Sequence, residues 1–366
     1  MGNIMEYVEN NMKSLEAKEF NAVDSLVLAV LSYIRFENIV PSLSERNAPV
    51  RIGELLKSEM FESMFHNLWD KESHRRIFFA FAASPRFRNT YLNFYTSISD
   101  PALDMQFSAV TFLLEDKTAY IAYRGTDSTF VGWKEDFNMA YMSTVPAQGE
   151  GAKYLNIVAG EIPDANKLRV GGHSKGGNIA VYSAVHCVPS VQKRIGMVYN
   201  HDGPGFKDNL FESPEFIRIK DHIHTTLPEE ALIGMLLQHH EDYLVIKSMK
   251  HGVIQHDPFT WNVENDDFCY AQKIKGGALI RSKTINEWLN SIGDEKRKLF
   301  IDALFQLLRK TEYESFHELS EEWQKGAVTL LSTIKNSDPE IRIFVVKTMN
   351  ELAKLSVKNL IKQNKQ

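Results

Sequence analysis

Cysteine is almost absent from this sequence, which contains only Cys187 and Cys269 in 366 residues. Two cysteines exclude a disulfide-stapled scaffold, and neither stands in a spacing typical of a metal site. No stretch approaches the roughly 18 apolar residues that a membrane-spanning helix needs. The start of the chain, residues 1–6, has no basic region followed by an apolar run, so we expect no signal peptide. We therefore expect a cytoplasmic protein that needs no metal or other cofactor.

A strong charge of either sign is also missing. The 42 Lys and Arg residues nearly balance the 47 Asp and Glu residues, which leaves a net charge of −5. This balance excludes a global nucleic-acid-binding surface. The hydrophobic content of 43% is that of an ordinary globular protein, and the length allows a core domain with an appended piece.

The middle of the chain alternates between strand and helix patterns. Residues 1–75 have mainly helical patterns, and residues 74–83 predict another helix. The predicted strands after them are residues 107–114, 118–124, 168–170, 195–200, 217–226 and 243–246. The predicted helices between them are residues 130–140, 150–160, 178–188 and 229–238. Such alternation predicts an α/β fold in which helices cover both faces of a sheet.

The last part of the sequence has only helical patterns. Apolar residues recur at three-and-four spacing in residues 285–289, 298–308, 323–331 and 341–360. Lys275-Gly276-Gly277 is a plausible joint, so we predict a first domain over residues 1–275 and a helical extension over 276–366. The terminal helix is amphipathic and rich in lysine. We expect it to pack on the protein, with contact to an anionic membrane surface as the alternative.

One heptapeptide carries the strongest chemical signal in the chain, Gly171-Gly172-His173-Ser174-Lys175-Gly176-Gly177. It lies between a predicted strand and a predicted helix, the setting in which a G-x-S-x-G match indicates a nucleophile elbow. Gly172 and Gly176 remove side chains that would clash in so sharp a turn. The turn would present the Ser174 hydroxyl above the sheet and direct the Lys175 amide toward a developing oxyanion.

A serine nucleophile needs a base and a carboxylate that orients the base. Asp202 follows the predicted strand 195–200 and is the first choice for the acid, with Glu230 as the alternative. His256 lies in a loop after the last predicted sheet strand and is the choice for the base, with His251 as its nearest competitor. These positions follow the chain order Ser, Asp, His of α/β hydrolases.

A second amide is needed to hold an oxyanion, and Thr126 is the candidate. It follows the predicted strand 118–124 within Tyr123-Arg124-Gly125-Thr126, where Gly125 permits a turn. Its amide and its hydroxyl could both donate hydrogen bonds. No group of histidines and carboxylates in the sequence has a convincing metal spacing.

Taken together, these segments resemble the class 3, or fungal-type, lipase family. The resemblance rests on residues 123–126, on Trp133 and Phe137, and on residues 172–177, and it extends over most of the chain. The form of the elbow and the downstream Asp202-Gly-Pro-Gly-Phe are closer to a bacterial branch of lipase-like proteins. The resemblance implies that Thr126 is an oxyanion donor and that residues 127–142, with Phe130, Trp133 and Phe137, form a mobile lid over the substrate pocket.

Two positions depart from the class 3 pattern. That family places its acid after the next strand, where this chain has Glu229-Glu230 and no aspartate. The position of Asp202 instead resembles that in pancreatic-type lipases. Lys175 stands where lipases more often carry an apolar residue, and its side chain could reach solvent or favour an anionic acyl substrate.

The sequence therefore predicts a serine esterase that acts on a small-molecule or lipid-like ester. Two other hypotheses remain open at this point. One is a non-catalytic α/β-hydrolase scaffold that serves as a binding module, because fold alone does not guarantee chemistry. The other is an acyltransferase or thioesterase that uses the same three residues.

Overall fold

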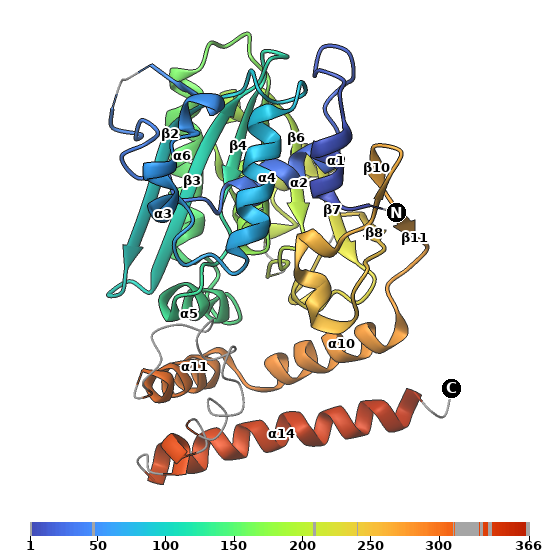
Figure 1. Ribbon diagram of the computed structural model, residues 1–366. Coiled ribbons are helices and arrows are strands. Elements are labelled where there is room, and N and C mark those ends of the chain that lie inside the picture. The colour runs from blue at the N-terminus through green and yellow to red at the C-terminus, as the bar shows by residue number, and fades with distance from the viewer. Residues whose placement is uncertain are drawn as a thin grey trace.

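The computed structural model describes residues 2–45, 48–207, 210–239, 241–309, 311, 329, 332–335 and 339–363. At the centre of this described part lies a nine-stranded sheet in the order β1-β2-β3-β4-β5-β6-β7-β8-β11 (Figure 1). Its strands are β1 (Val50–Arg51), β2 (Tyr91–Asp100), β3 (Met105–Leu113), β4 (Ala119–Tyr123), β5 (Leu168–His173), β6 (Ile195–His201), β7 (Ile223–Pro228), β8 (Tyr243–Ile246) and β11 (Tyr270–Ala271). A separate hairpin pairs β9 (Val263–Glu264) with β10 (Asp267–Phe268).

Strand direction divides the sheet into parts. The strands from β4 to β8 pair in parallel, whereas β1 to β4 pair antiparallel, as do β8 and β11. The parallel strands are nearly continuous runs of buried residues, because helices cover both of their faces. Their carboxyl ends meet at one edge, the place where α/β sheets carry functional groups.

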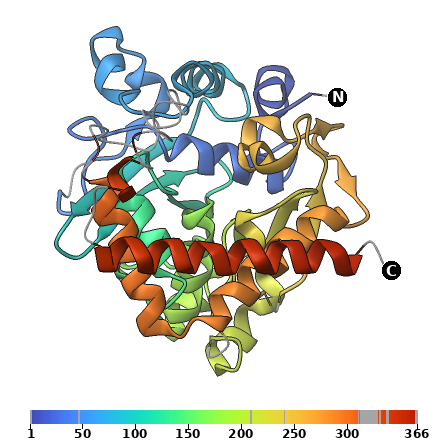
Figure 2. The ribbon, with the colours of Figure 1, turned by 90° about the horizontal axis from the view of Figure 1, so that it is seen from below.

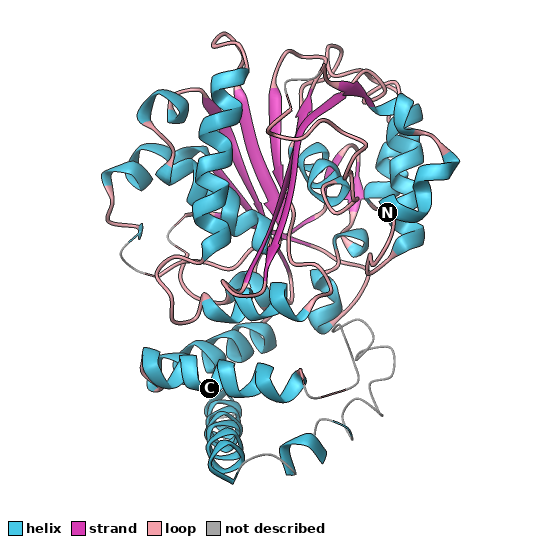
Figure 3. Cartoon of the chain, turned by 90° about the vertical axis from the view of Figure 1, so that its left-hand side faces the viewer, coloured by secondary structure: helices cyan, strands magenta, loops and turns pink. Residues whose placement is uncertain are grey.

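Helices cover both faces of the sheet (Figure 3). One layer contains α1 (Ile4–Asn10), α2 (Ala22–Leu31), α3 (Phe61–Met64) and α4 (Lys71–Ala83). The opposite layer contains α6 (Pro146–Glu161), α7 (Lys175–His186), α8 (Pro189–Gln192) and α9 (Pro214–Ile219). Each layer has its own buried hydrophobic cluster, and the predicted α/β fold is thereby confirmed.

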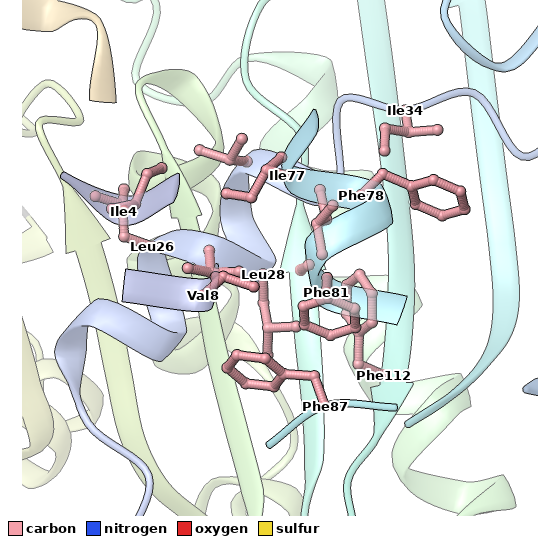
Figure 4. Close-up of a cluster of buried hydrophobic side chains, with 14 of the residues drawn as sticks. Ile4, Val8, Leu26, Leu28, Ile34, Ile77, Phe78, Phe81, Phe87 and Phe112 are labelled. Atoms are coloured by element: carbon pink, nitrogen blue, oxygen red, sulfur yellow. The ribbon is translucent and has the colours of Figure 1, made fainter. Parts of the chain in front are cut away.

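The N-terminal layer is anchored by a large apolar core and a buried ion pair. Phe78, Phe81 and Phe87 pack between the helices and the sheet, where they meet Leu28 (Figure 4). Beside this core the Arg86 guanidinium pairs with the Asp24 carboxylate, and both side chains are fully buried. Asp24 also caps α2 through the Asn21 backbone and accepts a hydrogen bond from the Tyr7 hydroxyl at 2.7 Å.

A third group of helices lies at the carboxyl end of the parallel strands. It contains α5 (Phe130–Asn138), α10 (Gly276–Ser291), α11 (Asp294–Leu308) and α14 (Pro339–Gln363). Figure 1 shows α5, α10 and α11 next to this end of the sheet, and Figure 2 shows α14 lying across α10 and α11. None of the helices in the described ranges is both long enough and apolar enough to cross a membrane.

Several predicted elements are present, with ends that differ from the prediction by a few residues. β3 and β4 form the hairpin predicted over residues 107–124, and α6 covers the helix predicted over residues 150–160. The strand, turn and helix around Ser174 are β5 and α7. α10 begins at Gly276, directly after Lys275. The division into two domains at this joint stays a prediction, and most of the predicted helix 323–331 lies outside the described residues.

Other predicted elements are wrong. Residues 229–238 contain only a short 3-10 turn, η5 (Ile233–Met235), because backbone groups of this segment bond to Asp202, Gly205 and Phe206 after β6. Residues 217–226 begin in helix α9, which is nucleated by Ser213 as its N-cap and Pro214 at its first position, and β7 starts only at Ile223. The strand β2 was not expected at all, and residues 50–60 form a short strand and 3-10 turns rather than a helix.

The buried ion pair in the N-terminal layer gives a stability prediction. Replacing Asp24→Asn leaves the Arg86 charge buried without its counter-ion, which we expect to lower the free energy of unfolding by about 3–5 kcal/mol. Glu62→Gln is the control, because Glu62 pairs with Lys71 at the surface with its side chain 84% exposed. That control should change stability by less than about 1 kcal/mol. Urea unfolding of the two variants makes the comparison, and equal effects would contradict it.

Candidate active site

Ser174 lies in the sharp turn between β5 and α7. Its backbone has φ 58° and ψ −132°, a conformation that L residues rarely adopt. The turn needs both flanking glycines, since a Cβ on Gly172 would lie 2.3 Å from the Gly176 carbonyl carbon. A Cβ on Gly176 would lie 2.1 Å from the carbonyl oxygen of Tyr123, at the end of β4. The elbow therefore packs directly against the strand that leads to Thr126.

Three side chains from separate strand ends meet beside this turn. Ser174 Oγ lies 3.0 Å from His256 Nε2, and His256 Nδ1 lies 2.6 Å from a carboxylate oxygen of Asp202. Asp202 follows β6, and His256 ends the 3-10 turn η6 (Gly252–His256) after β8. The structure thus brings together the three residues that the sequence singled out as nucleophile, base and first-choice acid.

Asp202 is fully buried and held on two sides. Its second carboxylate oxygen accepts a hydrogen bond from the Gly234 amide at 3.1 Å. Burial raises the pKa of Asp202, whereas the hydrogen bond from His256 lowers it.

His173 fixes the loop that carries His256. His173 Nε2 lies 2.8 Å from the carbonyl oxygen of His256, so this nitrogen must donate. His173 Nδ1 then accepts from the Tyr33 hydroxyl, 3.1 Å away. Burial pushes the pKa of His173 well below its usual value, which agrees with this neutral tautomer. The N-terminal layer therefore supports the position of His256 through Tyr33, a link that the sequence did not indicate.

Two backbone amides beside Ser174 are free to donate. In the part of the chain that the structure describes, neither the Thr126 amide nor the Lys175 amide forms a hydrogen bond. The Lys175 amide begins α7, where the partial positive charge of the helix terminus adds to its donor strength. The Thr126 hydroxyl donates to the Asp136 carboxylate, which ties the predicted oxyanion loop to α5.

The side chain of Lys175 contradicts both outcomes considered for it. It is 1% exposed, so it does not reach solvent. Its ammonium donates to Glu135 at 2.9 Å and to the backbone and side-chain oxygens of Gln106, also at 2.9 Å. Glu135 is completely buried and accepts two backbone amides as well. The lysine charge is therefore neutralised inside the protein. It gives no reason to expect a preference for anionic acyl groups.

Glu230 is not placed to act as the alternative acid. Its carboxylate accepts from the Gly252 amide at 3.0 Å and from Lys275 at 3.1 Å, on the outside of the loop. His251, the competing base, is exposed and lies 3.6 Å from the same carboxylate. The physical reason is that these partners, rather than His256, hold the Glu230 carboxylate.

Two apolar cavities open at Ser174. The larger, about 620 Å³, is bounded partly by residues of the N-terminal layer such as Tyr33, Trp69 and His74. The smaller, about 170 Å³, lies between α5, α10 and α11. Both share the same four residues at their junction, Trp133, Asp136, Ser174 and Ile233.

The predicted lid segment contains α5. Trp133 lines both cavities and Phe137 lines the smaller one, whereas Phe130 packs in the cluster of C-terminal helices. Lys134 ties α5 to its surroundings through ion pairs with Asp104 at 2.7 Å and Asp302 at 2.8 Å. The movement of this segment as a lid stays a prediction.

Asp136 is the main site residue that sequence reasoning missed. One signal in the sequence could have indicated it. Asp136 stands on the predicted helix 130–140, ten residues after Thr126, so its side chain can face back toward Thr126. Burial raises the pKa of Asp136 to about 6, although the nearby Lys175 lowers it. No cluster of three or more potential metal ligands occurs among the described residues.

Comparison with known proteins assigns the family. The model of the Mbeg1-like family matches residues 81–306, which is more than half of the chain. The chain belongs to the Mbeg1-like family. This family is lipase-like, so the resemblance to lipase-like proteins is confirmed, and the general activity class is that of a lipase or esterase. No curated protein matches the chain.

Two solved structures are similar to part of this Mbeg1-like chain. The crystal structure of M37 lipase is 13% identical, with a TM-score of 0.36, and the match covers 57% of this chain and 68% of that one. The Rhizomucor miehei lipase propeptide complex is 17% identical, with a TM-score of 0.31, over 50% of this chain and 63% of that one.

The raised pKa of Asp136 gives a pH-dependent prediction. In the folded protein this carboxyl keeps its proton up to about pH 6, whereas an unfolded chain loses it near pH 4. The contribution of Asp136 to the free energy of unfolding should therefore decrease as the pH rises from about 4 to about 6. Asp136→Asn removes this part of the pH dependence, which urea unfolding at several pH values measures.

Asp164→Asn is the matched control, because the Asp164 side chain is 99% exposed. It should leave the pH profile of stability unchanged. A profile of the Asp136 variant that runs parallel to the wild type would contradict the prediction.

Proposed function

We propose that this protein is a serine hydrolase that cleaves carboxylic esters through an acyl-enzyme on Ser174. One observation carries the proposal, namely the continuous chain of contacts from Ser174 Oγ to His256 at 3.0 Å and from His256 to Asp202 at 2.6 Å. A serine hydroxyl is a weak nucleophile at neutral pH and needs such a base. The constellation recurs on unrelated folds and is recognised by geometry rather than by sequence position.

The reaction follows from these contacts. His256 Nε2 takes the proton of Ser174 as Oγ attacks the ester carbonyl carbon. The negative charge that develops on the carbonyl oxygen is held by the amides of Thr126 and Lys175. Asp202 holds His256 by its Nδ1 hydrogen and stabilises the imidazolium. His256 then returns the proton to the leaving alcohol, and water, activated by the same ring, hydrolyses the acyl-enzyme.

The walls of the site support an apolar ester as the substrate. Phe259, Val253 and Ile254 line the larger cavity beside His256, and the smaller cavity is lined by aliphatic and aromatic side chains. Apolar walls with a few convergent polar groups are typical of sites for small apolar ligands. An acyl or lipid-like ester is therefore the substrate class that we propose.

The nucleophile is tested by a pair of serine variants on the same helical segment. Ser174→Ala should abolish labelling by a fluorophosphonate probe and lower ester hydrolysis by at least about 10³-fold, because no other group can form the acyl-enzyme. Ser183→Ala is the control, since Ser183 is buried on α7 away from the cavities. The probe should label the Ser183→Ala variant to the same extent as the wild type. Labelling that survives Ser174→Ala would contradict the proposal.

The acid is tested by comparing the two candidate carboxylates. Asp202→Asn should lower kcat by about 10³- to 10⁴-fold, because the amide no longer holds the required tautomer of His256 or compensates its charge. Glu230→Gln should change kcat by less than about twofold, since its partners are Lys275 and Gly252. Steady-state hydrolysis of a short-chain ester measures both. A larger loss in the Glu230 variant would assign the acid to Glu230 instead.

A further inference from the structure

We propose that the smaller cavity is an acyl-chain site whose outer wall is supplied by the C-terminal helices. The inference rests on the proposed function and specifies its substrate. The cavity begins at Ser174 and Lys175, at the amide that would hold the oxyanion, and continues between three helices. Its walls are apolar side chains from α5, α10 and α11 and from the segment between β7 and β8, including Phe137, Leu236, Ile285, Leu289, Ile292 and Phe300.

The charged groups at this cavity are occupied by the protein itself. Lys175 is bound to Glu135 and Gln106. Asp136, which also lines the cavity, accepts from the Thr126 hydroxyl and lies 3.8 Å from the Lys175 ammonium. The Arg297 guanidinium donates to the carbonyl oxygens of Ala140 at 2.6 Å and Ile292 at 3.0 Å. These bonds leave an apolar lining, which suits a hydrocarbon chain and opposes an acyl group with a charged end.

The position of His256 decides which part of an ester enters which cavity. His256 must return a proton to the leaving oxygen, so the alcohol has to lie on its side of Ser174. His256 lines the larger cavity together with Asp257 and Phe259. The smaller cavity is lined by Lys175, the residue after Ser174, and not by His256. The acyl chain therefore extends under α10 and α11, and the alcohol occupies the larger cavity.

The size of the smaller cavity sets the length of the chain. An apolar protein cavity of about 150 Å³ holds a benzene molecule, and this one measures about 170 Å³. It thus accommodates an acyl chain of roughly six carbons. The larger cavity, about 620 Å³, allows a bulkier apolar alcohol.

The C-terminal helices are fixed in this position by polar contacts as well as by packing. Arg297 on α11 binds the Ala140 carbonyl just beyond α5, and Lys207 bridges the Tyr141 carbonyl at 2.6 Å and Asp294 at 3.3 Å. The rings of Phe137 and Phe305 meet edge to face between α5 and α11. Outside this layer α14 crosses α10 and α11 (Figure 2). The acyl site is therefore built only when the C-terminal helices are in place.

The test uses p-nitrophenyl esters from acetate to laurate with the full-length protein. For the wild type, kcat/KM should be highest near hexanoate and at least about tenfold lower for laurate. Ile285→Trp fills the cavity, so the ratio of hexanoate to acetate kcat/KM should fall by at least about tenfold. Ile285→Ala enlarges the cavity and should shift the optimum to longer chains, a gain that misfolding cannot produce.

Val253→Trp is the matched control at the mouth of the larger cavity, where Val253 is 62% exposed. It should leave the dependence on acyl length unchanged. If Ile285→Trp lowers the turnover of the acetate and hexanoate esters equally, or leaves hexanoate turnover unchanged, the acyl-site inference is wrong. Ser174-dependent hydrolysis would still stand. If no ester is hydrolysed and no probe labels Ser174, the proposed function itself fails.

Discussion

The close packing of the Ser174 turn against the end of β4 is the constraint on which the site depends. Gly176 lies so near the Tyr123 carbonyl that no side chain fits between them. This contact places the start of α7, with Lys175, beside the loop after β4 that carries Thr126. It also holds Ser174 in a backbone conformation that the surrounding sheet must enforce.

Buried charge then couples this elbow to the helices below it. Lys175 follows Ser174 directly, and its ammonium is neutralised by Glu135 on α5. The neighbouring residue on that helix, Asp136, accepts the Thr126 hydroxyl. Breaking either contact would leave a charged or polar group buried without a partner, which is costly. The polar contacts of α5 therefore set the distance between the elbow and the C-terminal helices, and with it the width of the smaller cavity.

The supports of the three central side chains come from different parts of the chain. Asp202 is held by Gly234 after β7, and His256 by His173 and, through it, by Tyr33 of the N-terminal layer. The residues that line the cavities also come from distant parts of the sequence, from positions near 30 to positions near 300. Residues of the N-terminal and C-terminal helices thus line cavities that both open at Ser174.

The sequence by itself determined the elements that depend on local chemistry. The glycines at 172 and 176 require a sharp turn, the alternation of apolar runs requires an α/β sheet, and Asp202 and His256 stand where chain order and strand ends put them. Local patterns also misled, as in residues 217–226, where the cap at Ser213 started a helix instead of a strand. Only the tertiary structure decided the partner of Lys175, the exclusion of Glu230 from the site and the two cavities. These depend on contacts between residues 40 or more positions apart or on the path of a loop, and no short-range pattern in a sequence encodes such contacts.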